Sequence, residues 1–470
     1  MKHNRLLCAC ILLCPFAISV VFLPSVSSAQ PDLRHKLGQM VMVTVTGDSV
    51  EKSSASMDTL RNDLADGLLG GLVMFNWSGN LNSAGQIAHL TSELQKRTAV
   101  PLLLAIDEEG GMVARLGPAN GFSSTPSAYQ MGTVVNQESY TRSVAATMAG
   151  WFAQTGLNID LAPVVDVNVN PASPAIGALG RSFSAKPDSV AMHAGWFIDE
   201  FHKQSILTTL KHFPGHGSAT SDSHLGFTDV TSTWSPVELT PYSTLLQQGV
   251  VNAIMTAHVY NAYIDSVYPA TLSGPTITGI LRDQLGYQGV VISDAMGMTA
   301  ITSMYGMDEA AELAVRAGVD LLLYTSNLDS TGHSLARRII DVLERSVQLG
   351  RIPTAHIDSS YERIMSLKSS LVTSVARLAV DRLPKTIDLT SYPNPFNPST
   401  TIRFELPQAA DVKLAVFNML GQRVATLADQ RMSAGIHAVF FAGSNLASGM
   451  YVCRLEAESM AATVKLMLVK

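Results

Sequence analysis

A polar segment in the middle of the chain has the residue types that acid–base catalysis requires. Residues 211–226 (KHFPGHGSATSDSHLG) hold one lysine, three histidines, one aspartate and three glycines. Asp222 stands two residues before His224, so its carboxylate can accept the Nδ1 proton, select one tautomer and favour the protonated imidazole. A histidine held in this way is suited to act as a general acid and a general base.

Two other interpretations of this segment compete with the catalytic one. A solvated, glycine-rich surface loop with incidental histidines would not account for the carboxylate beside His224. A metal site could use His212 and His216, because residues four apart share one face of a helix. Pro214 and Gly215 lie between them and prevent that helix. We therefore expect a catalytic loop without a metal ion, in an enzyme that needs no cofactor.

The elements that position this loop are expected to be strands of a parallel barrel. Residues 206–210 (ILTTL), directly before the loop, are apolar and β-prone, which is typical of a buried strand. Seven further runs share this character, at residues 39–46, 70–75, 101–106, 158–165, 253–257, 289–293 and 320–324. Helical stretches between them, clearest at 81–97 and 188–204, indicate βαβ units. Eight such units predict an α/β protein with a TIM-like (β/α)8 barrel.

Polar residues stand directly after several of these runs. They are Asp107, Asp166, Lys211, His212, His258 and Asp294. The carboxyl ends of all strands of a barrel open on one rim, so we expect these side chains to converge in space. Asp166 could instead cap a following helix, as carboxylates at strand ends often do, but this would not explain Lys211 and His212.

The C-terminal part of the chain changes in character near residue 387. Three prolines within residues 393–398 exclude a helix there. Short runs of alternating hydrophobicity follow at residues 400–406, 412–417, 423–427, 435–441, 449–455 and 463–469. This pattern predicts a small all-β sandwich. The expected domains are a signal peptide at 1–29, the catalytic barrel at 30–375, a linker at 376–387 and the sandwich at 388–470.

The first 29 residues have the organisation of a secretory signal peptide. A basic start at 1–5 precedes an apolar run at 6–23 and a small-residue tail that ends at Ala29, where we expect cleavage. A membrane anchor is the alternative, because the apolar run approaches spanning length, but the small-residue tail favours cleavage. The mature chain would then have no stable membrane span. It would retain only Cys453, which excludes an intramolecular disulfide.

Composition narrows the possible partners. Of the 470 residues, 47% are hydrophobic and 15% are charged, which favours a large core and argues against disorder. The net charge is −6 and the sequence has no basic stripe, so we do not expect a nucleic-acid partner.

Four motifs in sequence order resemble those of glycoside hydrolase family 3, and more narrowly of its β-N-acetylhexosaminidase branch. They are residues 106–111 (IDEEGG), 180–183 (GRSF), 211–217 (KHFPGHG) with 222–224 (DSH), and 291–298 (VISDAMGM). The sequence departs from the family pattern at 217–219 (GSA), where Gly-Asp-Thr is common. It also departs at 225–227 (LGF), a place near which the family often has a proline.

The resemblance implies a retaining mechanism with a covalent glycosyl-enzyme. Asp294 would attack the anomeric carbon, and His224, held by Asp222, would protonate the leaving oxygen and then activate water. The residues implied to bind the sugar hydroxyls are Asp107, Arg181, Lys211 and His212. His258 is a further candidate for substrate contact, with a structural role as the alternative, and His216 is expected to support the loop.

The C-terminal part resembles the sorting domain of type IX secretion. The matching pieces are residues 392–398 (YPNPFNP), 417–421 (FNMLG) and 446–451 (LASGMY). The resemblance implies the type IX secretion machinery as a partner, and export through the periplasm to the cell surface or the medium. A sugar-binding β-module is the alternative for this part.

These observations lead us to expect a secreted exo-β-N-acetylglucosaminidase. Its carbohydrate substrate would be an N-acetylglucosaminide from peptidoglycan fragments or chitin oligosaccharides. A β-glucosidase of the same family is the nearest alternative. A phosphorylase is another, because a deprotonated histidine is neutral and repels phosphate less than a carboxylate does. An inactive sugar-binding surface protein is the alternative from a different class.

Overall fold

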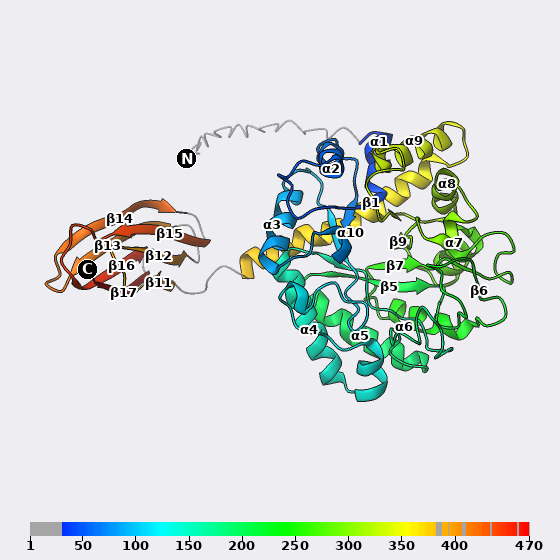
Figure 1. Cartoon of the computed structure of the whole chain (residues 1–470), viewed down its shortest axis with the longest axis horizontal. Helices are drawn as coiled ribbons and strands as arrows, with labels where there is room; N and C mark the ends of the chain where they lie inside the picture. The colour runs from blue at the N-terminus through cyan, green and yellow to red at the C-terminus, as the bar shows by residue number, and fades with distance from the viewer. Residues whose placement is uncertain are drawn as a thin grey trace, which may run out of the picture.

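The computed structural model describes residues 31–381, 388–392, 394–406, 410–432, 435–457 and 460–469. The expected signal peptide lies outside these residues. Figure 1 shows a larger body of strands and helices and a smaller body of strands. Within the described residues, none of the helices combines the length and the hydropathy that a membrane span requires.

Eight short parallel strands form the centre of the larger body (Figure 1). In the order in which they pair, they are β10 (Leu322–Leu323), β1 (Val41–Thr44), β2 (Gly71–Val73), β3 (Leu103–Ile106), β4 (Ile159–Asp160), β5 (Leu207–Phe213), β7 (Ala253–Thr256) and β9 (Val290–Ile292). A parallel bridge between Ile292 and Leu321 joins the last strand to the first. The expected TIM-like barrel is therefore confirmed, and each of the eight apolar runs contributes one strand.

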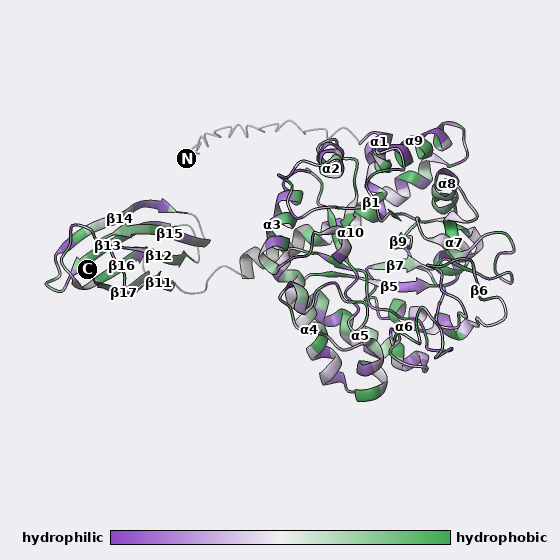
Figure 2. Cartoon of the chain, viewed as in Figure 1, coloured by the Kyte–Doolittle hydropathy of each residue, from purple (hydrophilic) through white to green (hydrophobic). Residues whose placement is uncertain are grey.

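Helices form the layer outside the barrel. They are α1 (Leu33–Gln39), α2 (Ala55–Ala65), α3 (Ala84–Gln95), α4 (Glu138–Thr155), α5 (Pro187–Lys203), α6 (Thr240–Gln247), α7 (Thr299–Thr302), α8 (Met307–Ala317), α9 (Leu335–Gln348) and α10 (Thr354–Asp381). Figure 2 shows both hydrophilic and hydrophobic residues on these helices. This is expected for a layer with one side on the barrel and the other on solvent. The strands are buried throughout, as sheets covered on both faces are.

Short elements complete the larger body. They are the 3-10 helices η1 (Asn76–Ser78), η2 (Pro118–Asn120), η4 (Pro236–Leu239) and η5 (Ala270–Leu272), the π-helices η3 (Gln130–Val135) and η6 (Pro275–Gln284), and the paired strands β6 (Thr228–Asp229) and β8 (Val259–Tyr260).

Several helices begin at serine N-caps, as at Ser54, whose hydroxyl accepts a hydrogen bond from the amide of Met57. Such caps satisfy an amide that the helix itself leaves unpaired.

The smaller body consists of two antiparallel sheets, which confirms the expected all-β part. One sheet pairs β11 (Asp388–Tyr392), β12 (Ser399–Leu406) and β15 (Gly435–Ala442). The other pairs β14 (Arg423–Met432), β13 (Ala410–Asn418), β16 (Gly449–Ala457) and β17 (Met460–Leu468). Alternate residues of β13, such as Val412, Leu414 and Val416, are buried in the core of this body. Cys453 is buried in the same core as a free thiol.

The boundary between the two parts differs in one respect from the expectation. The helix α10 continues to Asp381, so it extends into the expected linker at 376–387. Residues 382–387 lie outside the described residues. The domain limits given above stay a prediction.

Candidate active site

Strand β5 brings two of the expected site residues to the rim of the barrel. It continues through Lys211 and His212 to Phe213, three residues beyond the expected end. Both side chains therefore belong to the strand and not to the loop after it. The sequence suggested a loop because charged groups are rare in buried strands. The strand accommodates them because each has a carboxylate partner.

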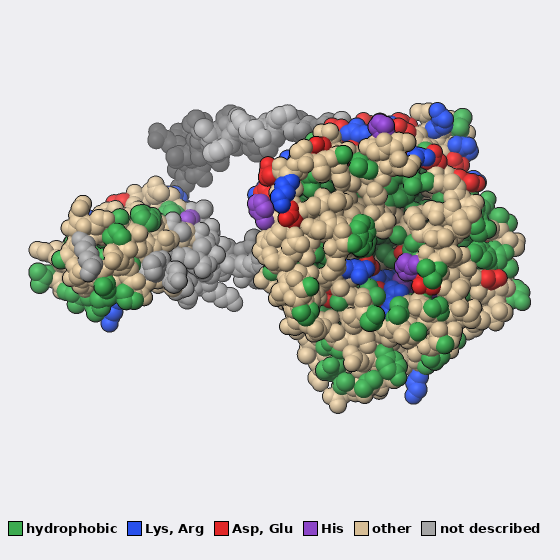
Figure 3. All heavy atoms as spheres, viewed as in Figure 1, with side chains coloured by type: hydrophobic (Ala, Val, Ile, Leu, Met, Phe, Trp, Pro, Cys, Tyr) green, Lys and Arg blue, Asp and Glu red, His purple; other side chains and the backbone are tan. Residues whose placement is uncertain are grey.

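A cavity of about 660 Å³ opens at the rim where these strands end. Six of the eight expected site residues line it: Asp107, Arg181, Lys211, His212, His224 and Asp294. Figure 3 shows basic, acidic and histidine side chains gathered in a hollow on this face of the larger body. The other two expected residues, Asp222 and His258, do not line the cavity but bind groups that do. The volume lies within the usual range of small-molecule sites.

Two buried cations on the inner side of the cavity are held by carboxylates. The Nζ atom of Lys211 lies 2.8 Å from Asp107 Oδ1 and 2.7 Å from Glu109 Oε1. Arg181 binds both oxygens of Glu109 at 2.8 Å, a bidentate and therefore strong arrangement. Burial acts to raise the pKa of Glu109, but Arg181 and Lys211 lower it by more. The Glu109 carboxylate is therefore ionised and fixes both cations.

Asp107 has a second cation on its other side. Its Oδ2 atom lies 3.2 Å from Nη2 of Arg115. Burial acts to raise the pKa of Asp107, but the charges of Lys211 and Arg115 together keep it below its usual value. Asp107 is therefore an ionised acceptor that faces the cavity, suited to bind hydroxyl groups.

His212 is oriented by Asp166, which lies behind it. The Oδ2 atom of Asp166 accepts the Nδ1 proton of His212 at 2.7 Å, and its Oδ1 atom accepts the backbone N–H groups of His212 at 3.2 Å and His216 at 2.8 Å. Asp166 thus orients the imidazole instead of capping a helix. With the proton on Nδ1, Nε2 of His212 accepts a hydrogen bond from Nη2 of Arg181 at 3.3 Å.

A buried glutamate holds the start of the loop after β5. The backbone N–H of Gly217 donates to Oε2 of Glu238 at 2.9 Å, and burial raises the pKa of Glu238 to about 8. Only glycine fits at 217, because a Cβ atom there would lie 1.8 Å from the carbonyl oxygen of Val167. The start of the loop therefore has little freedom to shift.

His216 connects this start of the loop to its catalytic end. Its Nε2 atom lies 3.0 Å from Oγ of Ser223, the residue between Asp222 and His224. Burial, together with the neighbouring His212, lowers the pKa of His216 to about 4. A neutral imidazole bound to Ser223 is consistent with the expected supporting role.

The Asp222–His224 pair has the geometry that its spacing predicts. The Oδ1 atom of Asp222 accepts the Nδ1 proton of His224 at 2.7 Å and the backbone N–H of the same residue at 2.9 Å. The His224 side chain is 60% exposed and borders the cavity. Nδ1 is engaged with the carboxylate, so Nε2 is the atom left to exchange protons with a bound ligand.

Asp294 follows β9 and enters the cavity as a carboxylate. Burial acts to raise its pKa, but nearby His258 and its hydrogen bond with the amide of Ala295 lower it by more. That amide lies 2.7 Å from Asp294 Oδ1. An ionised carboxylate on the cavity wall is the form that a nucleophile requires.

His258 lies beside this carboxylate and outside the cavity lining. Its Nε2–H donates to the carbonyl oxygen of Ala295 at 3.0 Å, and its Nδ1 atom lies 2.7 Å from the Thr271 hydroxyl. Burial lowers the pKa of His258, although the nearby Asp294 acts to raise it. These contacts support the structural alternative for His258, since they position the residue next to Asp294.

Comparison with known proteins identifies the family. The model of the glycosyl hydrolase family 3 N-terminal domain matches residues 32–367. The chain belongs to glycoside hydrolase family 3. The model of the secretion system C-terminal sorting domain matches residues 390–470. This family 3 enzyme is therefore a protein of the cell surface or the medium, with a type IX sorting domain.

Several curated and solved relatives of this family 3 enzyme carry related names. Beta-hexosaminidase A of Pseudoalteromonas piscicida is 31% identical over 375 residues, which cover 73% of this chain and 62% of that protein. Beta-hexosaminidase of Tolumonas auensis is 36% identical over 267 residues, which cover 55% of this chain and 76% of that protein. The chain thus spans less than two thirds of the length of the Pseudoalteromonas protein and more than two thirds of the length of the Tolumonas protein.

A solved structure resembles the chain over its larger part. It is a family 3 β-N-acetylglucosaminidase from Paenibacillus sp. FPU-7, with a TM-score of 0.66 and 32% identity, and the match covers 77% of this chain and 70% of that one. The β-N-acetylhexosaminidase from Beutenbergia cavernae has a TM-score of 0.64 and 26% identity, with 73% and 99% of the two chains covered.

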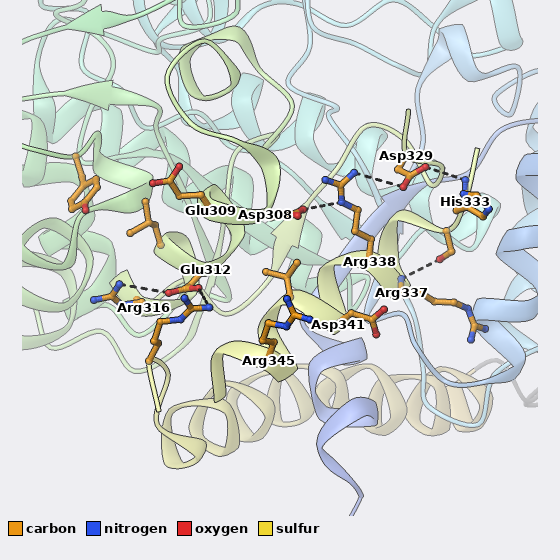
Figure 4. A pocket seen from close by; sticks show the side chains of 15 residues that line it. Asp308, Glu309, Glu312, Arg316, Asp329, His333, Arg337, Arg338, Asp341 and Arg345 are labelled. Carbon is orange, nitrogen blue, oxygen red and sulfur yellow. Dashed lines mark hydrogen bonds and ion pairs between the residues drawn. The ribbon is translucent and has the colours of Figure 1, made fainter. Parts of the chain in front are cut away.

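A second cavity, of about 890 Å³, lies in the outer layer beside α8 and α9 (Figure 4). Its charged side chains largely pair with one another, as Arg338 with Asp308 at 2.8 Å and Arg351 with Glu312 at 3.0 Å. None of the eight expected site residues is among the described residues that line it. We therefore assign the active site of this family 3 enzyme to the smaller cavity.

Three residues of the site were not among those expected from the sequence. The sequence did contain a signal for Glu109, because this residue follows Asp107 within an acidic motif, but its partner Arg181 lies 72 positions away. The sequence contained no signal for a role of Arg115 or Glu238. Their roles arise from contacts with Asp107 and with the loop after β5, which only the folded chain brings together.

Proposed function

We propose that the protein is a retaining exo-β-N-acetylglucosaminidase. It would remove terminal β-linked N-acetylhexosamine from peptidoglycan fragments or chitin oligosaccharides. The observation that carries this proposal is the presence, around one cavity, of an ionised Asp294 and of His224 held by Asp222. A nucleophile and a separate acid/base group are the two parts that a retaining glycosidase needs.

In the first step of the proposed reaction, an oxygen of Asp294 attacks the anomeric carbon. The bond from that carbon to the leaving oxygen breaks, and Nε2 of His224 gives its proton to this oxygen. The product is a covalent ester between the sugar and Asp294. Asp222 orients the imidazole for the transfer, because its carboxylate accepts from Nδ1 at 2.7 Å.

In the second step, Nε2 of His224 takes a proton from water, and the water oxygen attacks the same carbon. The bond to Asp294 breaks, which restores the carboxylate and the protonated histidine. Each displacement inverts the configuration, so the two together retain it. The exposed position of His224 on a glycine-containing loop suits a group that approaches the reacting carbon when substrate is bound.

The inner side of the cavity would hold the terminal sugar. Asp107 supplies an acceptor for hydroxyl protons, while Lys211 and Arg181 supply donors whose positions Glu109 fixes. Hydrogen bonds that involve charged groups are short and directional. The described residues that line the cavity hold three carboxylates, Asp107, Glu109 and Asp294, against three permanent cations, Arg115, Lys211 and Arg181. These residues therefore offer no excess of positive charge to bind phosphate, which favours hydrolysis over phosphorolysis.

The test compares two chromogenic substrates, a β-N-acetylglucosaminide and the matching β-glucoside. The wild-type protein should release the chromophore faster from the N-acetyl sugar, and His224→Ala should lose most of this rate. His89→Ala, which removes an exposed histidine on α3, is the control and should behave as the wild type. Equal or reversed sugar preference would contradict the N-acetyl assignment, and inactivity on both would favour a sugar-binding protein.

A further inference from the structure

An exposed aromatic side chain at the mouth of the cavity has no role in the reaction described above. Trp77 lies in η1, the turn that follows β2, and 66% of its surface is exposed. It lines the same cavity as Asp107 and Asp294. Burial of aromatic surface is favourable, so an indole that stays largely in solvent beside a ligand site is available to a bound ligand.

The indole is held in place by its neighbours. The ring of Phe75 stacks on Trp77, with centroids 5.0 Å apart and an angle of 14° between the planes. The Arg115 guanidinium lies 5.6 Å from the centroid of Phe75, which is a cation–π distance. The backbone of the turn is fixed as well, since Gly47 donates to the carbonyl oxygen of Ser78 at 2.9 Å.

The side chains that line the cavity differ in depth. Lys211 is 2% exposed and Arg181 is 9% exposed, whereas Trp77 is 66% exposed. An exo-acting enzyme holds the terminal sugar at the closed end of its site, and the rest of the substrate extends toward solvent. Trp77 is therefore placed to meet the part of the substrate beyond the bond that is cleaved.

The charges of the cavity indicate what this part of the substrate is like. The permanently charged cations among the described lining residues are Arg115, Arg181 and Lys211. Each has a carboxylate partner within 3.2 Å. The same lining holds three ionised carboxylates, Asp107, Glu109 and Asp294. An anionic group on the leaving sugar would therefore meet no excess of positive charge among these residues. A flat, neutral pyranose needs no cation as a partner, because its C–H groups can pack against the face of an indole.

We propose that Trp77, supported by Phe75 and Arg115, forms the leaving-group subsite of the enzyme, and that this subsite takes a neutral β-linked aminosugar ring. The chemistry corresponds to a chitin-type oligosaccharide and not to one whose next sugar carries a carboxylate, as muramyl sugars do. The inference rests on the proposed function and deepens it, since it selects between the two substrate classes named above.

The test measures kcat/KM for chitotriose and for methyl β-N-acetylglucosaminide, which has no second ring. Trp77→Ala should lower kcat/KM for chitotriose about tenfold, in line with the stabilisation that aromatic stacking supplies. The loss should be much smaller for the methyl glycoside. Trp77→Phe, which keeps a flat ring, should retain most of the activity on chitotriose. This result would show that the fold tolerates substitution at the position.

Phe440→Ala is the matched control, because Phe440 is exposed to the same extent but lies in β15 of the smaller body. It should leave both substrates unaffected. Equal losses of Trp77→Ala on both substrates, or no loss on chitotriose, would overturn the subsite. So would a wild-type preference for N-acetylglucosaminyl-muramic acid over chitobiose.

The same experiment distinguishes a wrong subsite from a wrong proposed function. A wild-type protein that cleaves the methyl glycoside, with no selective effect of Trp77→Ala on chitotriose, would leave the proposed function standing and overturn the subsite alone. A wild-type protein that cleaves neither substrate would overturn the proposed function, and the subsite with it.

Discussion

The most quantitative prediction concerns a lysine buried in the helical layer of the barrel. Lys368 in α10 is 1% exposed. Its Nζ atom donates a hydrogen bond to Oε1 of Gln39 at 2.6 Å. Burial lowers the pKa of Lys368 from 10.5 to about 7. We predict that Lys368→Met stabilises the protein near neutral pH.

The magnitude follows from the two pKa values. Between pH 7 and 10.5 the unfolded chain binds a proton at this lysine and the folded chain does not, so stability rises with pH. At about 1.4 kcal/mol per pKa unit, the cost to folding is about 4 kcal/mol at pH 7 and about 1.4 kcal/mol at pH 9.5. Below pH 7 both states are protonated and the cost is constant.

The substitution also removes a partner of Gln39, which costs roughly 1–3 kcal/mol at every pH. The pH dependence separates the two effects. The gain in unfolding free energy of Lys368→Met over the wild type should shrink by about 3 kcal/mol between pH 7 and 9.5.

The assay is urea unfolding of wild type and variant at both pH values. Lys96→Met, which removes a lysine that is 66% exposed, serves as the control and should show no such change. A difference between Lys368→Met and wild type that does not vary with pH would refute the reasoning.

Two further predictions concern the loop and the histidine beside it. Gly217→Ala should lower the unfolding free energy by about 3 kcal/mol or more and reduce kcat/KM, because its Cβ would clash with the carbonyl of Val167. Gly226→Ala, in the same loop but with open space around the added atom, should do neither, and equal effects would contradict the argument. Asp166→Asn should destabilise the fold by about 3–5 kcal/mol, measured by urea unfolding. It should also change the tautomer of His212 in nitrogen NMR spectra, and unchanged ring shifts would contradict the assigned orientation.

The barrel could be predicted because its signal is repeated along the chain. Each apolar run is long enough to be a strand, and helical stretches separate the runs, so topology follows from connectivity. The convergence of Asp107, Lys211, His212 and Asp294 then needs only the rule that all strands end at one rim. The pairing of Asp222 with His224 was accessible because the two residues are local in sequence.

Other parts of the site could not be predicted for physical reasons. Lys211 and His212 stand within β5 because Asp107 and Asp166 pair with them across the barrel, and sequence spacing does not reveal such partners. The contacts of Glu109 with Arg181 and of Glu238 with Gly217 likewise span 72 and 21 positions. The end of α10, in contrast, could have been predicted, because residues 376–380 (ARLAV) continue as helix formers and contain no breaking residue.

The central claim is that Asp294 becomes covalently bound to the sugar and that His224 completes the cycle. The most direct test is intact-protein mass spectrometry, followed by peptide mapping, of His224→Ala mixed with an aryl β-N-acetylglucosaminide whose leaving group needs no protonation. The account predicts an added mass of one N-acetylhexosamine residue, located on the peptide that contains Asp294 and absent from His224→Ala/Asp294→Ala. An adduct on another residue, or release of the aryl group without any adduct while hydrolysis continues at the wild-type rate, would contradict it.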